Sequence, residues 1–223
     1  MDFSSKDPSK GYLELAKQYK KIHLEGSSRV DLNKNNPEKT YNGWATLTFA
    51  DFIQKVIQKN KCKTLLDYGS GKGDFYFKER KFNNKLYPPI KEFWKVDPTL
   101  FDPGIDGYEK PYNKKFDIVI SLDVLEHIPA QDLNWVLNEI FSFSKKIVFL
   151  NIACFPADII LPDGRNAHVS IFKPEKWFQE ILQIVKKYKL KVFLVCSIFK
   201  NKKLEFISYG INEDFKNYEK SNN

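Results

Sequence analysis

The stretch Thr64-Leu-Leu-Asp-Tyr-Gly-Ser-Gly-Lys-Gly-Asp74 decides how this chain folds. Its apolar start is typical of a short buried strand, which delivers the acid Asp67 to the edge of a sheet. Glycines follow at alternate positions, at Gly69, Gly71 and Gly73. Glycine lets the backbone turn tightly and lets a ligand approach where a side chain would block it. The stretch therefore predicts a strand followed by a turn that faces a ligand.

Strands and helices alternate on either side of this stretch. Further strands are predicted at 92–98, 116–122 and 146–152, and helices at 11–24, 48–60, 72–82, 132–142 and 174–187. Two last strands, at 189–197 and 203–210, are separated by a short polar turn, which suits an antiparallel pair. The alternation predicts an α/β fold, Rossmann-like and doubly wound. Its sheet would be mostly parallel, with an antiparallel C-terminal edge strand.

The length of 223 residues is enough for one domain with a sizeable core. We expect a helical or irregular N-terminal extension over 1–40, a single domain over 41–210 and a polar tail over 211–223. No run of about 18 apolar residues is present, so no membrane span is expected. The three cysteines are far apart and no secretory signal is evident, which predicts free thiols in a cytoplasmic protein.

The chain is basic, with a formal net charge of +8 and a pI of about 9.1. A nucleic-acid partner must therefore be considered. The lysines are scattered in pairs along the chain, however, so we favour a diffuse solvated surface over a nucleic-acid groove. Such a surface would also steer a small anionic substrate. No group of His, Cys or carboxylate residues has the spacing of a metal site, so no metal is expected.

Three acids, Asp67, Asp97 and Asp123, stand at the predicted ends of strands. Ligands of doubly wound sheets bind outside the carboxyl ends of the strands. One such acid is usually a helix cap, whereas three around a glycine turn indicate a polar ligand. We expect Asp97, at the end of the second strand, to accept hydrogen bonds from the cis-diol of a ribose. The alternative is a turn aspartate before Pro98.

Other nucleotide-binding motifs fit the glycine turn less well. A dinucleotide fingerprint Gly-x-Gly-x-x-Gly requires glycine where the chain has Asp74. A P-loop requires serine or threonine after Gly71-Lys72, and the chain has Gly73 there. The pattern that remains is an acid followed by Gly-x-Gly-x-Gly.

That pattern resembles the first motif of class I S-adenosylmethionine (SAM) dependent methyltransferases. The stretch Phe116-Asp-Ile-Val-Ile-Ser-Leu-Asp-Val-Leu-Glu-His-Ile128 resembles a second motif of the small-molecule enzymes among them. The closing strand pair is also a feature of this family. Together with Asn166-Ala-His168 and a Trp-bearing helix after Pro174, the chain resembles one bacterial subgroup over roughly residues 40–185.

The resemblance implies that SAM is the cofactor and that the glycine turn, the second strand's end and the 121–123 turn surround it. The expected cofactor-binding residues are Asp67, Gly69, Ser70, Gly71, Asp97, Pro98, Leu122, Asp123 and Trp44. Trp44 would cover the cofactor as part of a lid with Tyr41 and Asn42, or it would serve ordinary packing.

The loop over 153–172 follows a strand end, so we expect it to carry the acceptor site. His168 can act as the base, because a histidine pKa lies near working pH. Arg165 can pair with a phosphate or carboxylate, and Asn166 and Tyr41 are further substrate-binding candidates. The alternative is that this loop is a turn in which His168 bonds the backbone. His127 lies near the acceptor in some relatives, or it only begins a helix; both interpretations stay open.

These observations predict SAM-dependent methyl transfer to an oxygen or nitrogen of a small, anionic bacterial metabolite or sugar-linked group. Surface-polysaccharide biosynthesis is a lead on the pathway, because many relatives occur in that context. One alternative is an RNA methyltransferase, although the Asn/Asp-Pro-Pro-Tyr motif of amino-methylating enzymes is missing after the 116–122 strand. The other is a SAM-binding regulatory module without catalytic activity.

Overall fold

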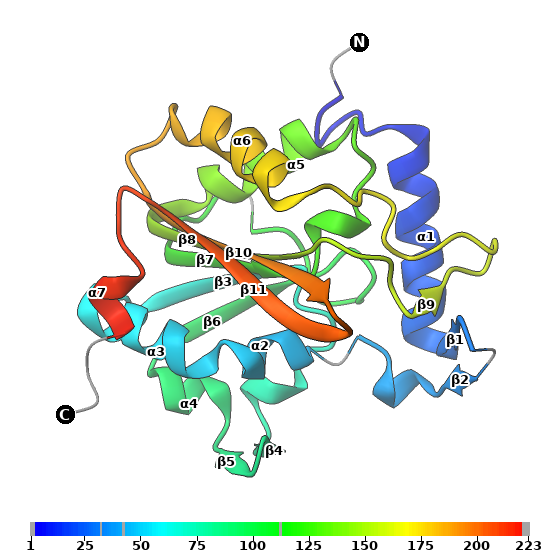
Figure 1. The fold of residues 1–223 in the computed structure, drawn as a ribbon, viewed down its shortest axis with the longest axis horizontal. Helices are drawn as coiled ribbons and strands as arrows, with labels where there is room; N and C mark the ends of the chain where they lie inside the picture. The colour runs from blue at the N-terminus through cyan, green and yellow to red at the C-terminus, as the bar shows by residue number, and fades with distance from the viewer. Residues whose placement is uncertain (1–2, 32, 42, 112, 220–223) are drawn as a thin grey trace.

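The computed structural model describes residues 3–31, 33–41, 43–111 and 113–219. Its centre is a six-stranded sheet with the order β11-β10-β8-β7-β3-β6 (Figure 1). The strands are β3 (Thr64–Tyr68), β6 (Asp97–Phe101), β7 (Phe116–Leu122), β8 (Ser144–Ala153), β10 (Lys191–Lys200) and β11 (Lys203–Ile211). All neighbours pair in parallel except β11, which runs antiparallel to β10 at the edge. The predicted α/β fold and its antiparallel edge strand are confirmed.

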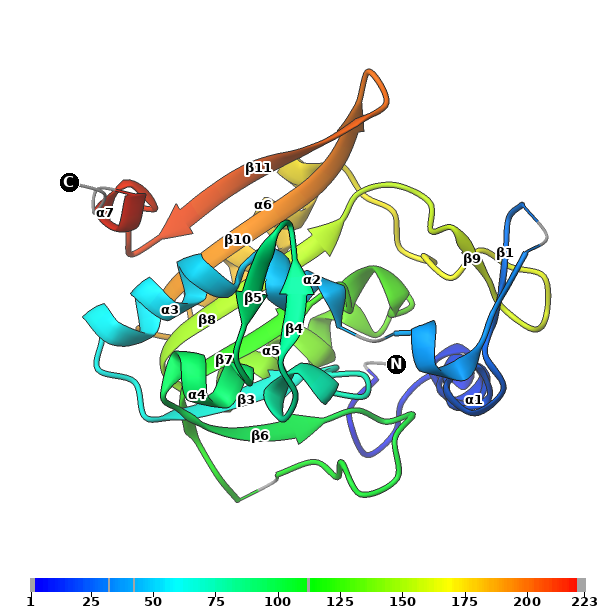
Figure 2. The same cartoon turned by 90° about the horizontal axis from the view of Figure 1, so that it is seen from below.

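Helices cover both faces of this sheet. On one face lie α2 (Trp44–Thr48), α3 (Ala50–Lys59) and α4 (Ile90–Trp94), which Figure 2 shows in front of the strands. On the other lie α5 (Leu133–Ser142) and α6 (Pro174–Val185). A strand covered on both faces must be apolar on both, and Ile118, Val119 and Ile120 of β7 are all fully buried.

The N-terminal extension is docked on the domain by a buried polar contact. Helix α1 (Lys10–Glu25) is capped by Ser9, whose hydroxyl accepts the backbone N–H of Tyr12. The same hydroxyl donates to Asp132 at 2.5 Å. The chain after α1 forms β1 (Ser27–Arg29) and β2 (Lys34–Asn35), and β1 pairs with both β2 and β9 (Ile159–Ile160) of the long loop. A short 3₁₀ turn, η1 (Pro37–Lys39), then leads to α2.

Two predicted elements are wrong. The segment expected to be a strand over 92–98 is helix α4 followed by β6, because Ile90 and Trp94 lie one helical turn apart and are both buried. The segment expected to be a helix over 72–82 is the turn η2 (Asp74–Tyr76) and a hairpin of β4 (Arg80–Phe82) and β5 (Lys85–Tyr87). Asn83 and Asn84 both have positive φ, which is the geometry of a tight two-residue hairpin.

Part of the expected polar tail forms a short helix after β11. Helix α7 (Lys216–Glu219) brings Tyr218 to 2% exposure against Phe52 and Phe193. Within the described residues, no helix combines the length and the apolar character that crossing a bilayer requires.

Strand β3 carries a buried acid. Asp67 is 3% exposed and accepts a hydrogen bond of 2.9 Å from the hydroxyl of Tyr76. Burial raises the pKa of this carboxyl from 3.8 to about 7, although the Tyr76 hydrogen bond opposes the shift. The folded protein therefore binds this proton more tightly than the unfolded chain does.

This asymmetry predicts a stability effect of Asp67→Asn that depends on pH. The folded wild type holds the extra proton between about pH 4 and pH 7, so its stability falls as pH rises through that window. Asparagine does not titrate and keeps an acceptor for Tyr76. Relative to wild type, the variant should gain up to about 4 kcal/mol in unfolding free energy from pH 4 to pH 7. Urea denaturation at both pH values measures this gain, and a difference that does not change with pH would contradict it.

Candidate active site

A cavity opens where the central strands reach their carboxyl ends. Residues 69–71, 102–103 and 122–124, which follow or end β3, β6 and β7, form its floor. The remaining wall comes from α1, from Tyr41, from residues 43–45 and from residues 127–128. Its volume is about 220 Å³, somewhat below the roughly 300–1,000 Å³ of drug-sized ligand sites.

The glycine turn after β3 has a backbone that other residues could not adopt easily. Gly69 has φ +85° and Gly71 has φ +55°. A Cβ on Gly71 would lie 2.5 Å from the carbonyl oxygen of Tyr41, closer than atoms can approach. The N–H groups of Gly69 and Ser70 donate to the carbonyl of Phe101 at 2.8 and 3.1 Å, which ties the turn to the end of β6. Gly69, Ser70 and Gly71, which are expected to bind the cofactor, line the cavity.

Asp102 is the acid at the end of β6. Its two carboxylate oxygens accept the backbone N–H groups of Gly71 and Gly104, both at 2.8 Å. The Nε2 atom of His23 lies 3.8 Å from the same carboxylate. Asp102 therefore joins the glycine turn, the loop after β6 and helix α1 at one point of the cavity wall.

The position predicted for this acid, Asp97, is wrong. Asp97 is the first residue of β6, is exposed, and pairs with Thr64 at the start of β3. It therefore lies at the opposite end of the strand from the cavity, as does its neighbour Pro98. The chain contains a second Asp-Pro pair, at Asp102-Pro103, directly after the apolar residues Leu100 and Phe101. This second Asp-Pro pair after an apolar run is the feature of the sequence that points to Asp102 as the acid at the strand end.

The other two strand acids differ from each other. Asp67 is buried within β3 and does not line the cavity. Asp123 does line it, beside Leu122, and has a strained left-handed φ of +54°. Its side chain keeps exposed surface because it faces the cavity, while the surrounding protein raises the pKa of its carboxyl to about 6.

An aromatic wall closes one side of the cavity. Tyr19 of α1 packs edge-on against Tyr41 and His127, with ring centroids 5.9 and 5.3 Å apart. Tyr41 lines the cavity as predicted, and its buried hydroxyl has no hydrogen-bond partner among the described residues. Asn42 lies outside those residues. The sequence did not indicate that Tyr19 and His23 line the cavity, because the apolar face of a helix does not reveal which surface of the domain it packs on.

Trp44 lies at the mouth of the cavity. Its side chain is 48% exposed and its ring packs against Phe75 and Phe82 at 5.9 and 5.7 Å. It is therefore both a packing residue and part of the cavity lining.

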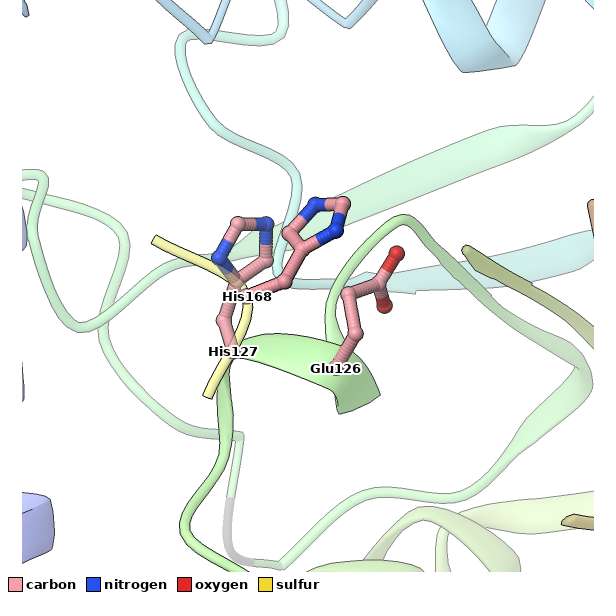
Figure 3. Close-up of side chains that lie close together, drawn as sticks. All are labelled: Glu126, His127 and His168. Carbon is pink, nitrogen blue, oxygen red and sulfur yellow. The ribbon is translucent and has the colours of Figure 1, made fainter. Parts of the chain in front are cut away.

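Two histidines predicted as catalytic lie beside each other (Figure 3). Their ring centroids are 4.8 Å apart, and His127 lines the cavity whereas His168 does not. The Nδ1 atom of His168 lies 2.5 Å from the carbonyl oxygen of Phe155, which agrees with the alternative that His168 bonds the backbone of its own loop. Burial lowers the pKa of His127 to about 3 and also lowers that of His168. Both rings are neutral at pH 7 and are weaker bases than a free histidine.

The same segment holds a third functional side chain, Glu126. One ligand-forming atom from each of Glu126, His127 and His168 lies within 4.8 Å of the other two. This group could hold a metal ion, and the expectation that no metal is bound stays a prediction. The spacing did not indicate the group because the fold brings His168 back from a separate loop.

Arg165 and Asn166 are used by the loop itself. Arg165 is exposed and pairs with Asp163, with 2.6 Å between Nη2 and Oδ2. The side-chain amide of Asn166 accepts the backbone N–H of Ala157 at 2.9 Å and donates to the carbonyl oxygen of Ala157 at 2.8 Å. Neither residue lines the cavity, and no lysine or arginine does so within the described part of the chain. The expected anion-binding side chain is therefore missing from this wall.

Comparison with known proteins agrees with this architecture. Residues 41–183, more than half of the chain, match the model of a family described as a methyltransferase domain. A comparison with curated proteins finds no match. The matched segment contains the glycine turn, Asp102, Asp123 and all three residues of the Glu126 group. The chain therefore belongs to the methyltransferase-domain family.

Proposed function

We propose that this protein transfers the methyl group of SAM to an oxygen or nitrogen atom of a small molecule. The observation that carries the proposal is the joint position of the glycine turn and Asp102 at one cavity. Asp102 follows the strand next to β3, where the ribose of a nucleotide-like ligand lies in doubly wound folds. Each of its oxygens has accepted only one backbone N–H, so lone pairs remain for a cis-diol.

The other groups of the cavity suit the rest of SAM. The left-handed glycine turn puts the backbone of Gly69 and Gly71 in the cavity lining, where a ligand can contact it directly. The carboxylate of Asp123 complements the positive charges of the sulfonium and the amino group. Trp44 offers an aromatic face for the adenine. In this proposal Gly69, Gly71 and Asp123 keep the cofactor-binding roles that the family resemblance implies. Asp102 takes the place of Asp97, and the adenine contact is added to the expected covering role of Trp44.

When bound, SAM supplies an electrophilic methyl carbon. The acceptor's nucleophilic atom would bond to that carbon, and the electron pair of the broken carbon–sulfur bond would stay on the sulfur of the leaving S-adenosylhomocysteine. The acceptor proton leaves to solvent. The chain's own contribution is to align the reactants and exclude water, which the wall of Tyr19, Tyr41 and His127 supports.

We place the acceptor at that wall, next to His127. A cavity of this size, closed on one side by α1, favours a small metabolite or a sugar-linked group over a nucleic-acid strand. The Asp-Val-Leu-Glu-His-Ile-Pro and Asn-Ala-His motifs favour the bacterial small-molecule subgroup, and polysaccharide modification is one context in which to screen. Release of S-adenosylhomocysteine from a panel of hydroxyl and amine acceptors tests this part.

Asp102→Ala should weaken SAM binding by about 100-fold, since it removes two charge-assisted hydrogen bonds to the ribose. Isothermal titration calorimetry measures the change. Asp97→Ala is the matched control, because it removes the same group at the other end of the same strand, and its affinity should equal that of wild type. Asp102→Asn keeps one acceptor oxygen, so its SAM affinity should lie between those of Asp102→Ala and Asp97→Ala.

Thermal unfolding of each variant checks that the turn still folds. A folded Asp102→Ala protein that binds SAM as wild type does would refute the assignment of the ribose site.

Trp44→Ala should weaken SAM binding about five- to tenfold, the usual effect of losing one aromatic stacking partner of a base. Phe77→Ala is the control, because Phe77 is similarly exposed, at 53%, but does not line the cavity. Fluorescence titration of both variants gives the comparison. Equal losses in the two variants would show that Trp44 does not contact the cofactor.

A further inference from the structure

Glu126, His127 and His168 form a compact group of metal-type donors at the inner edge of the cavity. Figure 3 shows the two imidazole rings side by side, with the carboxylate of Glu126 directed toward the ring of His168. One donor atom of each residue lies within 4.8 Å of the others. Two bonds of about 2.1 Å to a shared cation would place donors about 3 to 4 Å apart. A small inward movement of the side chains would therefore complete the site.

Glu126 has a free oxygen although it is completely buried. Its Oε1 accepts the backbone N–H of Ala153 at 2.8 Å, whereas its Oε2 has no hydrogen-bond partner among the described residues. A buried carboxylate oxygen without a partner is costly. The negative charge of Asp123 also acts on Glu126. A cation would satisfy the free oxygen and offset both carboxylates.

Both histidines are oriented as metal ligands usually are. The Nδ1 atom of His127 lies 2.9 Å from the carbonyl oxygen of Ala167, and that of His168 lies 2.5 Å from the carbonyl oxygen of Phe155. Each Nδ1 can carry the hydrogen and donate it to its carbonyl. This leaves the Nε2 lone pairs free, and backbone acceptors of this kind fix the ring of a ligating histidine.

We propose that Glu126, His127 and His168 bind one divalent first-row transition-metal cation. Two imidazole nitrogens favour such an ion over Mg²⁺ or Ca²⁺, which prefer sites built of oxygen. Three protein donors leave coordination positions open, and His127 lies at the cavity wall, so an open position would face the acceptor.

The site, if the proposed methyl transfer holds, also defines the acceptor's chemistry. A cation there would bind an acceptor through a hydroxyl or carboxylate oxygen and favour the loss of a hydroxyl proton. It would thus supply the positive charge that no lysine or arginine of the described cavity lining provides. Neutral histidines then serve as ligands instead of bases.

Co²⁺ titration of the EDTA-treated full chain, followed by visible absorption, tests the site without any substrate. Wild type should bind one Co²⁺ per chain. Glu126→Gln and His168→Asn should each weaken binding at least about 100-fold, more than the loss of an outer-shell partner usually costs. His23→Asn removes the remaining histidine of the chain and should bind Co²⁺ as wild type does.

Circular dichroism confirms folding, and the half-buried His168 gives a second variant in case Glu126→Gln does not fold. Absence of saturable one-to-one Co²⁺ binding by wild type, or unchanged binding in folded His168→Asn, would overturn the proposal. SAM affinity, measured on the same metal-free protein, separates the two conclusions. Retained SAM binding without Co²⁺ binding contradicts only the metal site, whereas Co²⁺ binding without SAM binding contradicts the proposed function.

Discussion

The hydrogen bonds that Asp102 accepts from Gly71 and Gly104 are the constraint on which the cavity depends. They hold the left-handed glycine turn against the loop after β6, so two neighbouring strand ends keep one fixed arrangement. Tyr41 then passes so close to Gly71 that only glycine fits there. From this point the wall extends through Tyr41 to Tyr19 and His127, and the N-terminal helix becomes part of the cavity.

The architecture of the sheet could be predicted from the sequence because its signals are local. The apolar runs of β3, β7 and β8 and the amphipathic helices α3, α5 and α6 each fit one periodicity. The segment around 90–102 could not be assigned in this way. Its apolar residues fit a strand or a short helix, and only the pairing of Asp97 with Thr64 shows where β6 begins. A shift of a few residues there made Asp97, instead of Asp102, the acid expected at the strand end beside the cavity.

Most of the predicted residues that line the cavity belong to the two motifs, as at Gly69–Gly71, Leu122 and Asp123, although Tyr41 and Trp44 line it from outside them. Residues with several chemical uses were harder to place. Asn166 looks like a hydroxyl ligand in sequence, yet its amide closes the loop on Ala157. The Glu126 group joins two segments that the sequence keeps apart, so only the return of the long loop to η3 (Leu125–His127) reveals it.

Asp102 and His127 both line one cavity, and the proposed function assigns the ribose of SAM to Asp102 and the acceptor to the wall beside His127. A crystal structure with S-adenosylhomocysteine tests this account most directly. The account predicts that both ribose hydroxyls lie within hydrogen-bond distance of the Asp102 carboxylate and that the sulfur points toward His127. A ligand whose ribose lies away from Asp102, or one bound outside this cavity, would contradict it.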